Sequence, residues 1–212
     1  MDLLKILGSQ IAFVIQNAEL FNNLEKAYLD TLSALTNAID AKDSYTRGHS
    51  DRVTELSVRL AKEANLANSD LEKIRLGGML HDIGKIGIPE NILNKPGRLD
   101  DHEFEIIKSH PVLGVTILGS VEFLQNVVPI IKHHHERYDG NGYPDKLKGT
   151  NIPFLARIVS IADTYDAMTS NRPYRKALTV EESLKEIERC KGTQFDPDLA
   201  ELFVKMIQRD GH

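Results

Sequence analysis

The sequence contains a single cysteine, Cys190, among its 212 residues. One thiol excludes an internal disulfide, and it also excludes the zinc sites that are built from several cysteines. The chain has eight histidines, by contrast. Any metal ion held by this chain must therefore be bound by histidine, aspartate or glutamate side chains.

Long hydrophobic runs are absent as well. No segment approaches the roughly 18 uninterrupted apolar residues that a membrane-spanning helix needs. The first residues, MDLLKILGSQIAFVIQ, lack both the cationic start and the cleavage site of a signal peptide. We therefore expect a cytoplasmic chain with no membrane span.

Positive charge is in deficit, and the formal net charge is -5. This balance disfavours broad electrostatic binding to a nucleic-acid polymer or to an acidic membrane. A small phosphate ligand held in a local positive pocket remains compatible with it.

The alternating pattern of β-strands is also missing, and helical periodicity takes its place. With 41% hydrophobic and 27% charged residues and no low-complexity tract, the composition is that of an ordinary globular protein. The length suits one domain with an appended element. The predicted fold class is all-α, with a long helix over residues 1–39 followed by a helical bundle over residues 40–212.

The long N-terminal helix is predicted from heptad spacing. Apolar residues recur at alternate steps of three and four from Leu4 to Ile39, and only Glu25 in this series is polar. Such a seam is typical of a helix that faces a partner, so we predict a parallel coiled coil and a homodimer. Packing of the helix on its own domain is the alternative.

The same helix resembles part of a sensory domain. The segment QIAFVIQNAELFNNLEKAY is similar to the final helix of a GAF domain that runs into an output domain. This resemblance covers about the first 30 residues. It implies that the chain is the output end of a longer signalling protein.

Capping residues predict where several later helices begin. Ser69 is expected to cap SDLEKIRLGGMLHDIG, and Asp100 with Glu103 forms a capping pair for DDHEFEIIKSH. The other start signals are two first-turn prolines and a capping threonine: Pro129, Pro153 and Thr179.

Side chains that can bind metal recur along the predicted helices. They lie just before the first core helix, on the second, at the end of the third, on the fourth and on the fifth: His49, His81, Asp82, His110, His134, His135 and Asp163. Mixed imidazole and carboxylate ligands suit a hard divalent cation. The carboxylate of Asp82 has two oxygens and can bridge two cations.

The remaining histidines are not expected to be ligands. His133 is excluded because three adjacent residues of a helix point about 100° apart and cannot all face one site. His102 and His212 are predicted to lie on the surface.

Four segments together resemble a known family, the HD-GYP domain, which is a branch of the HD phosphohydrolase superfamily. They are HDIGK at 81–85, HHERYDGNGYP at 134–144, ADTYDAM at 162–168 and the FDP of GTQFDP, and the match extends from about Asp40 to Pro197. The resemblance implies a helical HD fold with a non-haem centre of divalent metal ions. Iron and manganese are expected first, with nickel and cobalt as further candidates.

The resemblance also implies how the ligands are shared between two ions. One ion would be held by His49, His81, Asp82 and Asp163. The second would be held by Asp82, His110, His134 and His135. Relatives with a third metal carry a glutamate four residues before the first of these histidines, where this chain has Tyr45. Two metals are therefore expected rather than three, with Asp43 or a water as the available compensation.

Other residues are expected to contact the substrate. Lys85 lies one helical turn after Asp82, within reach of a phosphate oxygen or of the departing alkoxide. Arg172 and Arg175 are suited to bidentate contacts with phosphate or guanine. The resemblance adds Tyr143 of the GYP motif.

The loop DGNGYP is expected to form a wall of the substrate site. Gly140 and Gly142 permit backbone conformations that are closed to other residues, and Pro144 stiffens the exit of the loop. Glu136 is expected to orient a ligand imidazole from outside the coordination sphere. Asp139 and Asp166 either do the same or cap and brace the loop.

The resemblance implies hydrolysis of the bacterial messenger cyclic di-GMP. We hypothesise that a hydroxide bridging the two cations attacks phosphorus in line, giving pGpG and, after a second cleavage, GMP. One alternative is a hydrolase of another cyclic dinucleotide or nucleotide. Another is a ligand-sensing adaptor without turnover that acts through partners such as GGDEF-type cyclases. Metal-dependent turnover distinguishes the hydrolases from the adaptor.

Overall fold

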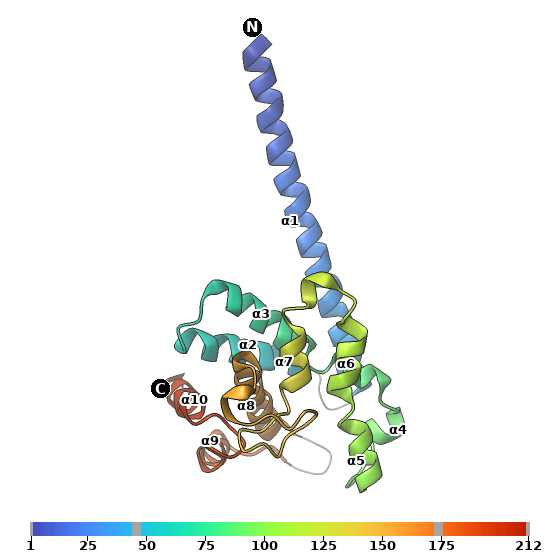
Figure 1. The fold of residues 1–212 in the computed structure, drawn as a ribbon, viewed down its shortest axis with the longest axis vertical. Coiled ribbons are helices and arrows are strands. Elements are labelled where there is room, and N and C mark those ends of the chain that lie inside the picture. Colours follow the sequence, from blue (N-terminus) through green and yellow to red (C-terminus); the bar gives the residue numbers. More distant parts are fainter. Residues whose placement is uncertain (1, 44–47, 172–175, 211–212) are drawn as a thin grey trace. The chain divides into compact units, whose positions relative to one another are not determined.

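The structure is a computed structural model that describes residues 2–43, 48–171 and 176–210. It contains two compact units, Met1–Leu35 and Thr36–His212. Helix α1 (Asp2–Lys42) supplies the first unit and also the first residues of the second (Figure 1). The boundary predicted after residue 39 falls inside this helix.

The predicted long N-terminal helix is confirmed as α1. All side chains that the structure describes between Leu3 and Leu24 are exposed. Ile11 and Phe21 of the predicted seam are 60% and 68% exposed. No helix among the described residues is both long enough and apolar enough to cross a bilayer.

The second unit is a succession of helices, and the predicted all-α class is confirmed: no β-strand occurs in residues 48–171 or 176–210. The α-helices are α2 (His49–Glu63), α3 (Asn68–Leu80), α4 (Glu90–Leu93), α5 (Asp101–Ile107), α6 (His110–Leu118), α7 (Val128–His133), α8 (Phe154–Thr169), α9 (Val180–Arg189) and α10 (Pro197–Asp210). Short 3-10 turns are η1 (Ile83–Gly87), η2 (Glu122–Leu124) and η3 (Gly149–Asn151).

The main core joins five helices of the second unit. Helix α2 packs against α3 and α8, and α10 contacts α2, α8 and α9 (Figure 1). Each of these helices contributes a buried apolar side chain: Leu60, Ile74, Ile161, Ile187 and Phe203. Burying one such side chain contributes about 1.5 to 3 kcal/mol, so this core fixes the frame on which α2, α3 and α8 present their polar ends.

A smaller cluster fixes α7, the helix that precedes the HHE motif. Ile130 of α7 packs with Val53 of α2 and with Val159 and Ala162 of α8. Helix α7 also contacts α3 and α6. The motif after α7 is therefore held against every helix that carries another metal-capable residue.

The predicted helix starts are confirmed in part. Capping boxes form at Asp100 with Glu103 and at Thr179 with Glu182, and Pro129 lies in the first turn of α7. The cap at Ser69 was wrong, since the amides of Asp70 and Leu71 donate to the carbonyl of Ala67, and α3 begins at Asn68 with Ala67 as its N-cap residue. Pro153 precedes α8 as its N-cap residue.

The predicted places of the histidines on their helices need correction. His110 does not end a helix but begins α6, because Pro111 lacks an amide hydrogen and is tolerated only in a first turn. His134 and His135 follow the last residue of α7. His49 is the first residue of α2, and His81 and Asp82 lie between α3 and η1. The metal-capable residues thus gather at helix ends, with Asp163 within α8 as the exception.

Candidate metal centre

The structure brings all seven predicted ligands together. His110, His134 and His135 form one group with Asp82, and His49 and His81 form a second group with the same Asp82. Within each group the candidate ligand atoms lie within 4.8 Å of one another. The carboxylate of Asp163 joins the second group, with its Oδ1 atom 3.2 Å from Nε2 of His49. Asp82 is therefore shared between two clusters of donors.

Three of the imidazoles are oriented by the carbonyls of helices that end just before them. The Nδ1 atoms of His81, His110 and His134 lie 2.6, 2.7 and 2.8 Å from backbone carbonyl oxygens three residues earlier. A carbonyl only accepts hydrogen bonds, so Nδ1 carries the proton and Nε2 presents its lone pair to the cluster. Carbonyls near helix ends lack the usual partner four residues ahead, which leaves them available for this bond.

Unpartnered polar atoms show that the cluster fits a cation. Among the described residues, Nε2 of His81 and Oδ1 of Asp82 are buried and have no hydrogen-bond partner. Nε2 of His110 lies 3.3 Å from that oxygen. Buried polar atoms without partners are costly, whereas neutral imidazole and carboxylate are good ligands of divalent transition metals. The two donor groups, which share Asp82, therefore suit divalent metal ions.

His49 is supported by a carboxylate and an arginine. Its Nδ1 atom lies 2.7 Å from Oδ2 of Asp166, and Arg52 donates to the same carboxylate at 2.5 and 3.0 Å. Burial opposes the charged form of His49, but Asp163 and Asp166 outweigh it and raise its pKa to about 9. The expected supporting place of Asp166 agrees with this geometry. The contribution of Arg52 was not predicted from the sequence.

Glu136 and Asp139 brace the loop and do not hold a ligand imidazole, which corrects the expectation for Glu136. The carboxylate of Glu136 accepts the backbone N–H groups of Asp145 at 2.7 Å and Leu147 at 3.1 Å. Asp139 accepts from the backbone of Asn141 and from Arg137. Both acids therefore fix the shape of the loop DGNGYP.

The non-ligand histidines lie where they were expected, as far as the structure describes them. His133 lies outside both donor groups, with Nδ1 3.8 Å from the carboxylates of Glu136 and Asp145. His102 is exposed. His212 lies outside the described residues, as do Tyr45, Arg172 and Arg175.

The GYP loop lies directly against the cluster. The ring of Tyr143 stacks on His135 with centroids 4.9 Å apart. Gly140 has φ +86°, which suits glycine, whereas a Cβ atom on Gly142 would lie 2.3 Å from the backbone nitrogen of Arg137. The reason for a glycine at 142 is thus close backbone approach, and only Gly140 has the unusual conformation that was expected of both.

Lys85 places a positively charged side chain beside the candidate ligands. Its ammonium lies 2.7 Å from Asp82 and 3.0 Å from Asp43. Burial alone would lower the pKa of Lys85, but these two carboxylates outweigh it and raise the pKa above its ordinary value. Lys85 is therefore charged at neutral pH and is poised at the edge of the cluster.

Lys108 is a second cation near the GYP loop, and the sequence reasoning missed it. Its ammonium lies 4.8 Å from the ring centroid of Phe104 and 5.9 Å from that of Tyr143. The available signal was its place two residues before His110.

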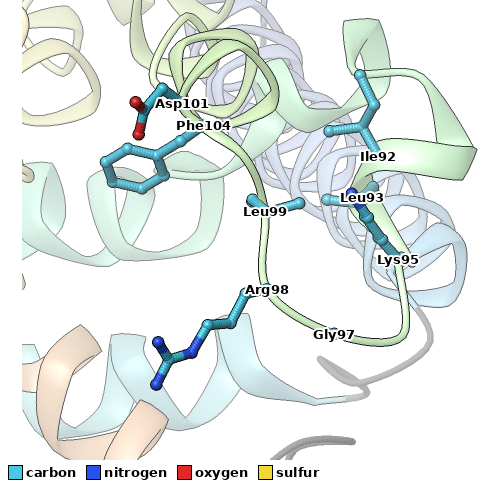
Figure 2. Close-up of a pocket in the computed structure, with 8 residues that line it drawn as sticks. All are labelled: Ile92, Leu93, Lys95, Gly97, Arg98, Leu99, Asp101 and Phe104. Carbon is cyan, nitrogen blue, oxygen red and sulfur yellow. The ribbon is translucent and has the colours of Figure 1, made fainter.

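A pocket of about 590 Å³ lies between α4 and α5, outside the ligand cluster. Figure 2 shows Lys95 turned toward Ile92 and Leu93, while Arg98 extends away from them. Lys95 pairs with Glu103 at 2.6 Å. None of the seven candidate ligands is among the described lining residues. Phe104, which lines the pocket, also contacts the Lys108 ammonium.

The half-buried His135 predicts acid sensitivity of the metal-free protein. Burial, together with neighbouring His110, lowers the pKa of His135 from 6.5 to about 3. Between these values the unfolded chain binds more protons, so stability present above pH 6.5 is lost as the pH falls. We expect this group alone to lower the free energy of unfolding by about 2 kcal/mol between pH 6.5 and about pH 5.

Denaturant unfolding in the presence of a chelator, at a series of pH values, measures this loss. His135→Gln should flatten the pH dependence, while His102→Gln, at an exposed position, should leave it unchanged. Equal slopes for His135→Gln and the unmodified protein would contradict the assignment.

Comparisons with known proteins show the family of the chain. A family model described as HD domain matches residues 33–199. A Thermotoga maritima protein named cyclic di-GMP phosphodiesterase is 40% identical over 206 residues, which cover 96% of this chain and 56% of that protein. A Vibrio cholerae protein named 3'3'-cGAMP-specific phosphodiesterase 2 is 37% identical over 205 residues, which cover 96% of this chain and 39% of that protein.

A solved structure shows likeness of fold. Bd1817, described as a HDG"Y"P protein from Bdellovibrio bacteriovorus, matches with a TM-score of 0.63 at 22% identity, covering 76% of this chain and 51% of that chain. The chain spans about half the length, or less, of the curated relatives it matches. From its family match and its motifs, the chain belongs to the HD domain family, within the HD-GYP group.

Proposed function

We propose that this chain hydrolyses the phosphodiester bond of cyclic di-GMP to pGpG, and further to GMP, at a centre of two divalent metal ions. The observation that carries the proposal is the position of Asp82, which belongs to both groups of candidate ligands. The relative from Thermotoga maritima carries the name of this activity. Iron and manganese are the proposed metals, with nickel and cobalt as alternatives.

The proposed ligand sets follow the two groups. His49, His81, Asp82 and Asp163 hold one ion. Asp82, His110, His134 and His135 hold the other. When bound, the two cations supply an activated water as nucleophile and neutralise charge on the phosphate.

The chain's own residues bind and orient the substrate around this centre. Lys85 contacts a phosphate oxygen and stabilises the departing alkoxide, since its ammonium is charged and faces Asp82. Tyr143 presents its ring to the substrate beside His135, and Gly142 lets the loop approach closely. Arg172 and Arg175 supply further phosphate or guanine contacts in this proposal.

Product analysis tests the reaction. Protein purified without oxygen and loaded with ferrous iron or manganese is incubated with cyclic di-GMP, with 3'3'-cGAMP in parallel. We expect metal-dependent pGpG or GMP from cyclic di-GMP. Faster hydrolysis of 3'3'-cGAMP would favour the second candidate, which the Vibrio cholerae relative suggests by its name. Tight binding without turnover under either metal would favour an adaptor.

The exposed seam of α1 supports a homodimer in the proposed protein. Leu7, Ile11, Val14 and Phe21 are exposed at heptad spacing along one helix. An upstream sensor that shifts the paired helices, or a GGDEF-type partner, is the proposed source of control. Both depend on a second chain meeting this seam.

Sedimentation of matched variants tests the dimer. Replacing Ile11 and Phe21 with lysine should convert a dimer to a monomer, because each charge would be buried in the seam. Phe13 and Leu20 are also apolar and exposed but lie off the seam. Replacing these two residues with lysine should leave the dimer intact. Equal behaviour of the two pairs would remove the seam as the dimer contact.

A further inference from the structure

The C-terminal end of α1, within the second unit, is bonded to the segment that follows Asp82. The Lys42 ammonium donates to the backbone carbonyls of Lys85, Ile86 and Ile88, at 3.2, 2.7 and 2.7 Å. In return, the side-chain amide of Asn94 donates to the carbonyl of Lys42 at 2.8 Å. These bonds join two segments that lie about 40 residues apart in the sequence.

The next residue, Asp43, contacts Lys85 itself. Its buried carboxylate lies 3.0 Å from the Lys85 ammonium, which also lies 2.7 Å from Asp82. Lys85 is therefore held between a carboxylate of the candidate metal centre and a carboxylate at the end of α1. Asp43 belongs to neither group of candidate ligands among the described residues.

A lysine with Asp82 as its only acid partner would be poorly placed for the proposed reaction. Its flexible stem has four carbons, so one ion pair does not fix the ammonium. Asp82 would also be shared between the ammonium and the cations. A second carboxylate on the opposite side defines where the ammonium lies and leaves part of it directed away from Asp82.

We propose that Asp43 is a positioning residue that holds the Lys85 ammonium where it meets a substrate phosphate, with Lys42 fixing the backbone of the same turn. This inference rests on the proposed phosphodiesterase function. Asp43 acts through Lys85 and touches neither the metals nor the substrate. The end of α1 thereby takes part in the geometry of the active site.

A double-mutant cycle tests the proposal on the full chain loaded with manganese. The variants are Asp43→Asn, Lys85→Met and their combination, each measured for kcat, KM, bound metal and melting temperature. Misplacing a substrate contact by about 1 Å costs up to about 100-fold in rate, so we expect Asp43→Asn to lower kcat/KM by about 10- to 30-fold with two metals still bound. In the Lys85→Met background the same change should matter less than about twofold.

Controls separate positioning from a structural role. Asp43→Glu keeps the charge and should recover part of the activity. Asp70→Asn breaks a comparable ion pair with Lys73, 2.8 Å long but at the surface, and should change nothing. A similar loss from Asp43→Asn with and without Lys85, or loss of metal in Asp43→Asn, would overturn the proposal.

The test also distinguishes this inference from the proposed function. If the unmodified protein binds cyclic di-GMP but turns over no cyclic dinucleotide, the phosphodiesterase proposal fails. The double-mutant cycle is then measured with the dissociation constants of cyclic di-GMP in place of kcat/KM. Non-additive losses of affinity would then support positioning of Lys85, and additive losses would overturn it. Absence of both turnover and binding would overturn both.

Discussion

Replacing Asp82 with asparagine is expected to abolish nearly all hydrolysis of cyclic di-GMP and to lower the bound metal below two ions per chain. Asparagine has the size of aspartate but only one carbonyl oxygen and no charge, so it cannot bridge two cations. Two cations contribute several kcal/mol of charge stabilisation to the transition state. Losing about 4 kcal/mol corresponds to a rate lower by about 10³-fold.

Metal analysis beside turnover measures this effect. The matched control is Asp145→Asn, the same chemical change at a carboxylate that pairs with Lys132 outside the cluster. It should retain both ions and most of the rate. Two bound ions and more than a tenth of the normal rate in Asp82→Asn would show that this carboxylate does not bridge.

Replacing Gly142 with alanine is expected to disrupt the loop DGNGYP, which carries Tyr143 and lies against His135. The new Cβ atom would lie 2.3 Å from the nitrogen of Arg137 and 2.5 Å from the Cα of Glu136, and backbone cannot swing aside as a side chain can. Overpacking of this kind costs about 1 to 3 kcal/mol. Because His135 directly precedes this contact, we also expect a loss of about 100-fold in rate.

Thermal unfolding and turnover with metal loaded measure the two effects separately. Gly8→Ala is the matched control, since nothing lies within 4 Å of its new Cβ atom and alanine favours a helix. Normal activity in Gly142→Ala would mean that the loop can shift without moving His135. That outcome would contradict the place given to the loop beside the metal centre.

The candidate ligands were predictable from the sequence, because their order and motifs are specific. Their places at helix ends were not, since Pro111 and tertiary contacts decide where α5 and α7 stop. Gly84 shows the same limit: a Cβ there would lie 1.9 Å from the carbonyl oxygen of His110, a contact between segments distant in sequence. The HDIGK motif includes Gly84, but the motif alone does not predict that His110 lies against this glycine.

The roles of the acidic residues were the least predictable part of the site. A carboxylate beside histidines in sequence suggests a partner for an imidazole, yet Glu136 binds backbone amides of its own loop. Asp43 precedes His49 closely but reaches Lys85 instead. A carboxylate can accept hydrogen bonds from any of several donors nearby. Which donor it pairs with depends on distances in the folded protein, and the spacing of residues along the chain does not give those distances.

The carbonyl bonds of His81, His110 and His134 have a consequence for how the site acquires its metal. These rings take their orientation from backbone carbonyls at the ends of α3, α5 and α7, so folding alone orders them before an ion arrives. The entropy of arranging those ligands is then lost during folding and not during metal capture. Metal uptake should therefore be limited by entry of the ion and release of protons, and each bound ion should raise the melting temperature of an already formed fold.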